Sequence, residues 1–189
     1  VGVGVPFDAS LATWLYTGIA FDTGRFRFSS TTPAALMIAG EMVQAGADPQ
    51  RIAEQLFYEY RPATLSLLAA TLQSLECLLD GRLAILSLDH ALLSQEQYRD
   101  EDGDGFVDYA VSMQGVEVAA FLREHEPGCV RVSLRAKHDF DVRAVAEVFG
   151  GGGHRKAAGA RIAGSLHEVK AKLVAEVGHR LGATNDRLA

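Results

Sequence analysis

The chain has 189 residues, enough for one large domain or two small ones, and 48% of them are apolar and 22% charged. It contains no apolar run near the ~18–20 residues that span a bilayer and no signal-peptide pattern, so we expect a cytoplasmic protein without a membrane anchor. The net charge of −6 excludes a chain that binds nucleic acid through its overall charge, and two distant cysteines exclude a disulfide scaffold.

The first sixty residues predict helices rather than strands. Asp8 is a plausible N-cap, and Thr32 and Asp48, each followed by proline, have the pattern that begins a helix. Between the first two helices Phe26 and Phe28 alternate with arginines, which predicts a short half-buried strand. The expected helices cover residues 9–20, 33–45 and 49–60.

One more helix is expected before the pattern changes after Gly81. Pro62 opens a fourth helix, in which leucines recur at helical spacing until a turn at residues 80–81. Residues 126–128, Glu-Pro-Gly, predict a hairpin turn, and Ser165 with Glu168 forms a capping box. The expected strands cover residues 82–88, 116–123 and 129–135, and the expected helices cover 141–149 and 166–181.

These elements predict an α/β fold in three parts. The sequence begins at Val1 without methionine, and we expect it to be part of a longer protein. The expected parts are a mostly helical region at residues 1–61, a linker helix at 62–80, and a mixed-sheet α/β domain at 81–189.

Basic residues gather in one part of this acidic chain. Seven lie between residues 131 and 161, against three acidic ones, a surplus of four. Such a cluster suits a negatively charged ligand, although a chance cluster on a solvated face is the alternative. The basic residues are Arg131, Arg135, Lys137, Arg143, Arg155, Lys156 and Arg161.

Four consecutive glycines, at positions 150–153, precede His154. Such a run costs folding entropy, and it suits close approach of a ligand to backbone N–H groups arranged as an anion nest. The stretch that follows is compatible with a helix, whose N-terminus would add positive potential. The alternative is a flexible linker. The predicted binding residues are Arg135, Gly151, Gly152, Gly153, His154 and Lys156.

Acidic residues suggest two metal sites, one of them weak. Asp22 follows an apolar helix and precedes a glycine turn, so it is either a cap or a metal ligand. The first eighty residues contain no histidine, and any partner ligands of Asp22 must lie outside this chain. Residues 100–108 imitate a calcium loop, but Val111 stands where a bidentate glutamate is required. We expect an acidic solvated loop there, capping a helix near Asp108.

Two of these motifs together resemble a known family. Residues 15–29 resemble the fourth motif of the DHH phosphoesterase domain, and residues 150–159 resemble the GGGGH signature of the DHHA1 domain that follows it. Val132–Arg135 also matches the second domain. The resemblance runs from Pro6 to about Leu181, and it is strongest to the NrnA-type enzymes, which cleave short oligoribonucleotides and dephosphorylate 3′-phosphoadenosine 5′-phosphate.

The resemblance implies the C-terminal part of an enzyme with two metals, typically manganese. The other three metal-binding motifs of the family are absent here, and only Asp22 carries over as a ligand. Arg135, His154 and the glycines would grip a short RNA or a nucleotide, and the chain alone is expected to be nearly inactive. Alternatives left open are a non-catalytic nucleotide- or RNA-binding module, a cyclic-dinucleotide phosphodiesterase, and a domain that only dimerises. A homodimer is also possible for the enzyme.

Overall fold

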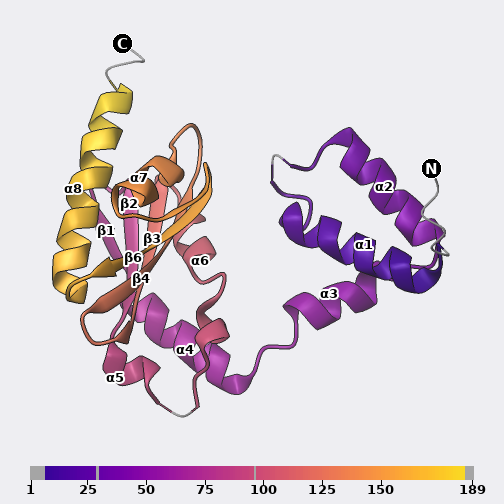
Figure 1. Ribbon diagram of the computed structural model, residues 1–189, viewed down its shortest axis with the longest axis horizontal. Coiled ribbons are helices and arrows are strands. Elements are labelled where there is room, and N and C mark those ends of the chain that lie inside the picture. Colours follow the sequence, from indigo (N-terminus) through magenta and orange to yellow (C-terminus); the bar gives the residue numbers. More distant parts are fainter. Residues whose placement is uncertain (1–6, 29, 96, 186–189) are drawn as a thin grey trace. The chain divides into compact units, whose positions relative to one another are not determined.

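Two compact units make up the structure, a computed structural model that describes residues 7–28, 30–95 and 97–185. The first unit is Val1–Tyr60 and the second unit is Arg61–Ala189 (Figure 1). The described residues of the first unit form helices, whereas the second unit combines helices with a sheet. None of the described helices is both long and apolar enough to cross a membrane.

The helices of the first unit begin where the capping residues predict. Asp8 accepts a hydrogen bond from the N–H of Leu11 at 2.9 Å, and Thr32 accepts one from the N–H of Ala35 at 3.1 Å. Asp48 caps the third helix in the same way, and proline follows Thr32 and Asp48 as the first helical residue. The three helices are α1 (Ala9–Asp22), α2 (Pro33–Gln44) and α3 (Pro49–Phe57).

The segment around Phe26 is a turn, so the strand predicted there is wrong. Arg25 and Phe26 have φ angles of 62° and 58°, in the left-handed region. The N–H of Arg25 donates to the carbonyl of Ala20 at 2.8 Å, and the N–H of Phe28 donates to that of Thr23 at 2.9 Å. Carbonyls at the end of α1 need donors, and this turn supplies them in place of a strand ladder.

The core of the first unit is small. Ala12, Met42, Ala47 and Ile52 are buried together. Many larger apolar side chains of the same helices stay exposed, and Trp14 has 73% of its surface accessible. In the first unit, therefore, more large apolar side chains lie exposed than are buried in its core cluster. Other exposed apolar side chains of α1 and α2 are Leu15, Phe21, Leu36, Met37 and Ile38.

A six-stranded mixed sheet forms the centre of the second unit, as the predicted α/β fold requires. Its strand order is β1-β2-β3-β4-β6-β5. The β2–β3 pair is parallel and every other pair is antiparallel. The strands are β1 (Glu76–Leu78), β2 (Leu83–Leu88), β3 (Val118–Glu126), β4 (Cys129–Ala136), β5 (Gly152–His154) and β6 (Ala157–Ala163).

Helices cover the two faces of this sheet unequally. Core residues of α7 and α8 pack against one face of β2, β3, β4 and β6. Residues of α4 and α6 pack against the other face, over β2 and β3. Figure 1 shows α8 on one side of the sheet, away from α4 and α6. The helical elements are α4 (Pro62–Gln73), α5 (His90–Leu93), the 3-10 turn η1 (Asp100–Gly103), α6 (Val107–Val111), α7 (Val142–Val148) and α8 (Leu166–Asn185).

The fourth helix is shorter than the leucine spacing predicts. It ends at Gln73, and residues 76–78 form β1, which pairs antiparallel with β2. The hydroxyl of Ser74 accepts a hydrogen bond from the N–H of Ser87 at 2.8 Å, which ties the end of the helix to β2. Leu67 is fully buried against the sheet. The helix therefore packs as part of the second unit. It ends before the later leucines because pairing of residues 76–78 with β2 outweighs their helical spacing.

Candidate nucleotide-binding site

The glycine run leads into a β-hairpin. β5 and β6 pair antiparallel with His154 opposite Ala157, so that Arg155 and Lys156 form the turn between them. The helix predicted after the glycines is therefore wrong. β6 lies between β5 and β4 and pairs with both, and this long-range pairing overrides the helix propensity of its alanines.

The fold itself explains three of the four glycines. A Cβ on Gly151 would lie 2.1 Å from the carbonyl oxygen of Gly159, and one on Gly153 would lie 2.6 Å from that of Ala157. Gly150 has a φ of 74°, a backbone angle that residues with a side chain rarely adopt. The N–H groups of Gly150 and Gly151 also donate to carbonyls at the end of α7. These two N–H groups are therefore not available to the anion nest that the run predicts.

Gly152 is the glycine that the fold leaves unexplained. A Cβ there would meet nothing within 4 Å, and its φ is not positive. Glycine in a strand costs conformational entropy, so some other factor must favour a bare backbone. A bare backbone at Gly152 suits the close approach of a ligand, which the sequence predicts for this run.

Register brings two of the predicted binding residues to one face of the sheet. Arg135 of β4 and His154 of β5 both stand opposite Ala157 of the intervening strand β6. Residues directly opposite in paired strands point to the same face. The next row on that face holds only small residues, Ser133, Gly159 and Gly152. We call this surface of β4, β6 and β5 the open face.

The guanidinium of Arg135 is held by protein atoms. Its Nε donates to Oδ1 of Asp108 in α6 at 3.0 Å, and Nη1 donates to the carbonyl of Leu134 at 3.1 Å. Sequence reasoning missed Asp108 as this partner, because the two residues lie 27 positions apart. Asp108 and Leu134 fix the side chain while leaving Nη2 without a hydrogen bond to any described residue. His154 is exposed and likewise makes no hydrogen bond within the described part of the chain.

Lys156 is engaged within the protein. Its Nζ donates to the carbonyl of Phe140 at 3.1 Å and approaches that of Lys137 at 3.5 Å. Burial lowers the pKa of Lys156, and the neighbouring Arg155 lowers it further. Arg155 itself donates to the carbonyl of Asp139 at 3.0 Å. The hairpin turn is thus tied to the loop between β4 and α7, and Lys156 does not project as the rim donor that the sequence predicts.

Asp22 is the last residue of α1 and is exposed. Its carbonyl accepts a hydrogen bond from the hydroxyl of Ser30 at 3.1 Å. No group of three or more His, Cys, Asp or Glu side chains among the described residues could hold a metal ion. The residues described here therefore do not fit a two-metal centre, and a metal role for Asp22 remains a prediction.

The acidic loop at residues 100–108 is more ordered than a solvated cap. Asp102 is buried and accepts hydrogen bonds from Thr64, from Arg61 and from the N–H of Arg99. Burial by itself raises the pKa of Asp102, but these hydrogen bonds outweigh it and lower the pKa. The expectation of a solvated loop is therefore wrong at this residue.

Two other acids of the same loop lie beside arginines of the sheet. Oδ1 of Asp104 lies 3.6 Å from Nη1 of Arg123. The side chain of Arg123 is only 2% exposed and lies over the ring of Phe121. Asp108 holds Arg135. Of the basic residues between positions 131 and 161, Arg135 is thus neutralised by an acid that precedes the cluster in the chain.

Comparison with known families defines the class of protein. The family model of the DHHA1 domain matches residues 81–182, and the chain belongs to this family. The resemblance drawn from the glycine run is thereby confirmed.

Known proteins similar to this chain are longer than it. It is 35% identical over 162 residues to the bifunctional oligoribonuclease and PAP phosphatase NrnA of Thermus thermophilus. The aligned residues make up 86% of this chain and 48% of that protein. It is 27% identical to the A-adding tRNA nucleotidyltransferase of Aquifex aeolicus, over 92% of this chain and 20% of that one. A solved structure of an exopolyphosphatase-related protein from Bacteroides fragilis matches with a TM-score of 0.84 and 27% identity, over 93% of this chain and 52% of that one. The chain therefore spans about half the length of NrnA.

Proposed function

We propose that this chain supplies the nucleotide-binding part of a phosphoesterase that hydrolyses short oligoribonucleotides or small nucleotides such as 3′-phosphoadenosine 5′-phosphate. The observation that carries the proposal is the open face, where Arg135 and His154 stand in one row and the neighbouring row holds only small residues. The similarity to NrnA, named for both activities, supports the same class of substrate.

The chemistry of the open face suits a phosphate beside a nucleoside. A ring N–H of His154 and Nη2 of Arg135 can donate hydrogen bonds to phosphate oxygens, and bonds that involve a charged partner are among the stronger ones in proteins. Asp108 orients the guanidinium before a ligand arrives, which lowers the entropy that binding must overcome. The bare backbone at Gly152 allows a sugar or base to approach closely.

The exposed apolar side chains of the first unit support the view that this chain is part of a larger enzyme. Helices such as α1 that are apolar around their circumference usually lie within a larger body. In the proposed enzyme Asp22 contributes one ligand to a manganese centre, whose other ligands come from outside the described residues. Manganese there would supply Lewis-acid chemistry at the scissile phosphate, whereas this chain binds and orients the substrate.

A second candidate function is RNA binding without catalysis. The similarity to a tRNA nucleotidyltransferase, over nearly this whole chain but only a fifth of that protein, favours it. A module of this kind would bind RNA for a catalytic domain of another type. Both functions need the open face, and a phosphatase or oligoribonuclease assay of the longer protein separates them.

Replacing His154 by alanine tests the proposed function. We expect the 189-residue chain to bind a fluorescently labelled dinucleotide, and the His154→Ala variant to lose at least about tenfold in affinity, because a charge-assisted contact contributes roughly 1.5–3 kcal/mol. Fluorescence anisotropy measures the Kd. His179→Ala removes an exposed histidine from α8 and is the matched control. Equal affinities of the wild type and the His154→Ala variant would show that the open face is not the binding site.

A further inference from the structure

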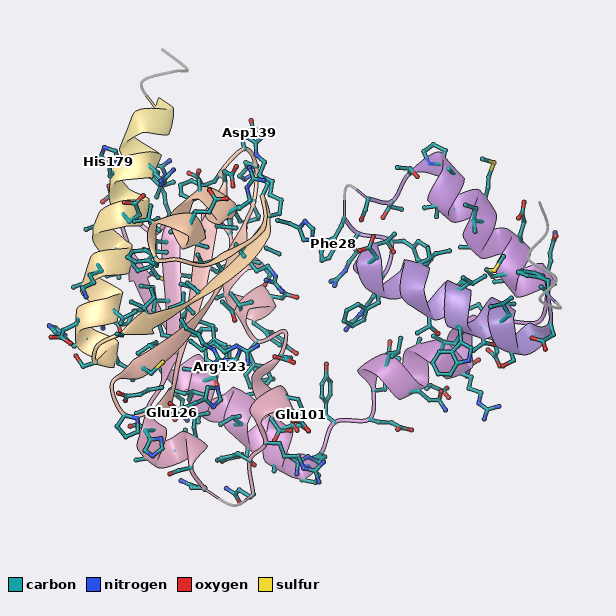
Figure 2. All side chains as sticks on the ribbon, in the orientation of Figure 1. Phe28, Glu101, Arg123, Glu126, Asp139 and His179 are labelled. Carbon is teal, nitrogen blue, oxygen red and sulfur yellow. The ribbon has the colours of Figure 1, made fainter. Side chains whose placement is uncertain are left out.

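A pocket lies at the other end of the open face from His154. It has a volume of about 290 Å³. Figure 2 shows Asp139 and Glu126 at opposite ends of the second unit. Arg155, next to His154, contacts Asp139, whereas Glu126 lines the pocket. The lining residues are His125, Glu126, Cys129, Arg131 and Arg161.

Strand geometry places this pocket on the same face as the candidate site. Side chains alternate along β6, so that Ala157, Gly159 and Arg161 share the open face while Ala158 and Ala160 are buried on the other. Arg161 lies four residue steps along β6 from Ala157, the partner of His154, and these steps span about 13 Å.

The path along the open face between these two points is smooth. The row between them holds Ser133, Gly159 and Gly152, which carry little or no side chain. These residues leave room at this row for a chain-like ligand on β6 and β5. Adding a Cβ at Gly152 meets no protein atom within 4 Å, which shows that this position is open.

The charges of the pocket favour an anion. Arg131 and Arg161 stand directly opposite each other on β4 and β6, an arrangement of like charges that destabilises a strand pair. Among the described residues that line the pocket, Glu126 is the carboxylate. Arg161 is exposed and makes no ion pair with a described residue. A phosphate bound there would accept charge-assisted hydrogen bonds from Arg161.

We propose that the pocket with Arg131 and Arg161 is a second phosphate subsite, which binds an oligonucleotide more than one nucleotide away from the phosphate at His154. This inference rests on the proposed function and extends it. The 13 Å between the two points exceeds the distance between neighbouring phosphates of a nucleotide chain. A dinucleotide with a single phosphate therefore occupies one point only, and longer oligonucleotides occupy both.

The test compares two ligands on the 189-residue chain and on an Arg161→Gln variant, without metal. The ligands are a dinucleotide and a pentanucleotide of RNA, each without terminal phosphates and each carrying an uncharged fluorophore. We expect Arg161→Gln to weaken pentanucleotide binding about tenfold and dinucleotide binding less than twofold. The slope of log K against log salt for the pentanucleotide should fall in magnitude by about 0.7, the value for one lost phosphate contact on a single strand.

Two further variants separate the possible failures. Arg143→Gln removes an exposed arginine from α7, which covers the opposite face, and should leave both affinities unchanged. His154→Ala should weaken both ligands. If it weakens neither, the proposed function fails and the subsite fails with it. If His154→Ala weakens both but Arg161→Gln weakens neither, or weakens both equally, only the subsite is overturned. Circular dichroism checks that each variant is folded.

Discussion

Three donors converge on the buried carboxylate of Asp102. They come from Arg61 and Thr64 at the start of α4 and from the backbone of Arg99. The carboxylate therefore joins the beginning of the second unit to the loop that precedes α6. A single acid holds these segments because a carboxylate offers about four acceptor positions.

Replacing Asp102 by alanine should destabilise the second unit by about 2–4 kcal/mol at pH 7, because buried donors lose their acceptor. Urea denaturation measures this change. Glu101→Ala, at an exposed neighbour, should change stability by less than about 0.5 kcal/mol. A loss for Asp102→Ala no greater than for Glu101→Ala would contradict the role given to this carboxylate.

The same residue predicts a pH dependence. Its pKa is lowered in the folded protein, so its stabilisation is fully present above the ordinary aspartate pKa of about 4 and is lost as pH falls through the lower folded value. The stability difference between the wild type and Asp102→Ala should therefore shrink below about pH 4. A difference that grows with acidity would contradict the direction of the pKa shift.

At the scale of elements, the glycines that lead into the β5–β6 hairpin differ in how far the fold requires them. Gly151 and Gly153 are needed because carbonyls of β6 pass too close for a Cβ. Gly152 faces open space. Neighbouring glycines in one motif thus have different physical reasons.

Alanine substitutions separate those reasons. Gly151→Ala should lower stability by about 1–3 kcal/mol, because its Cβ cannot fit beside the carbonyl of Gly159. Gly152→Ala should keep the stability of the wild type, or raise it by up to about 1 kcal/mol, and still weaken dinucleotide binding. Thermal denaturation and anisotropy measure the two effects. Wild-type binding by Gly152→Ala would remove Gly152 from the contact surface.

At the scale of the whole chain, the two units differ in how much apolar surface they bury. The first unit buries a cluster of four residues, Ala12, Met42, Ala47 and Ile52. The second unit buries large clusters on both faces of its sheet. Stability follows buried apolar area, so the two units should not open with equal ease.

Native-state hydrogen exchange tests this difference. Amides of α1 and α2 should exchange through openings of lower free energy than amides of β2, β3 and β4. In the proposed longer enzyme, covering the exposed side chains of α1 and α2 should slow exchange in those helices. Equal protection of both units in the 189-residue chain would show that the exposed apolar surface does not weaken the first unit.

Most of the helices and the central strands could be predicted from local sequence. The caps at Asp8 and Thr32 and the box at Ser165 act over two to four residues, so neighbouring residues suffice to predict them. The strand predicted at Phe26 is wrong because the chain forms a turn there that caps α1. Two other wrong predictions, the helix after Gly153 and the end of the fourth helix, concern segments that pair with other strands, β6 with β4 and β1 with β2. Local propensity could not reveal those partners.

The proposed binding site likewise combines features that the local sequence predicts with features that depend on contacts far apart in the chain. The sequence by itself determined the family, and it predicted the glycine run, His154 and Arg135 as anion-binding residues from the chemistry of these residue types. Only the tertiary structure decided that Arg135 and His154 share one face through β6 and that Asp108 holds the arginine. It also decided that Lys156 points inward and that Gly152 alone lacks a structural reason. Strand register and ion pairing join residues far apart in the chain, and their energies are settled only when the sheet forms.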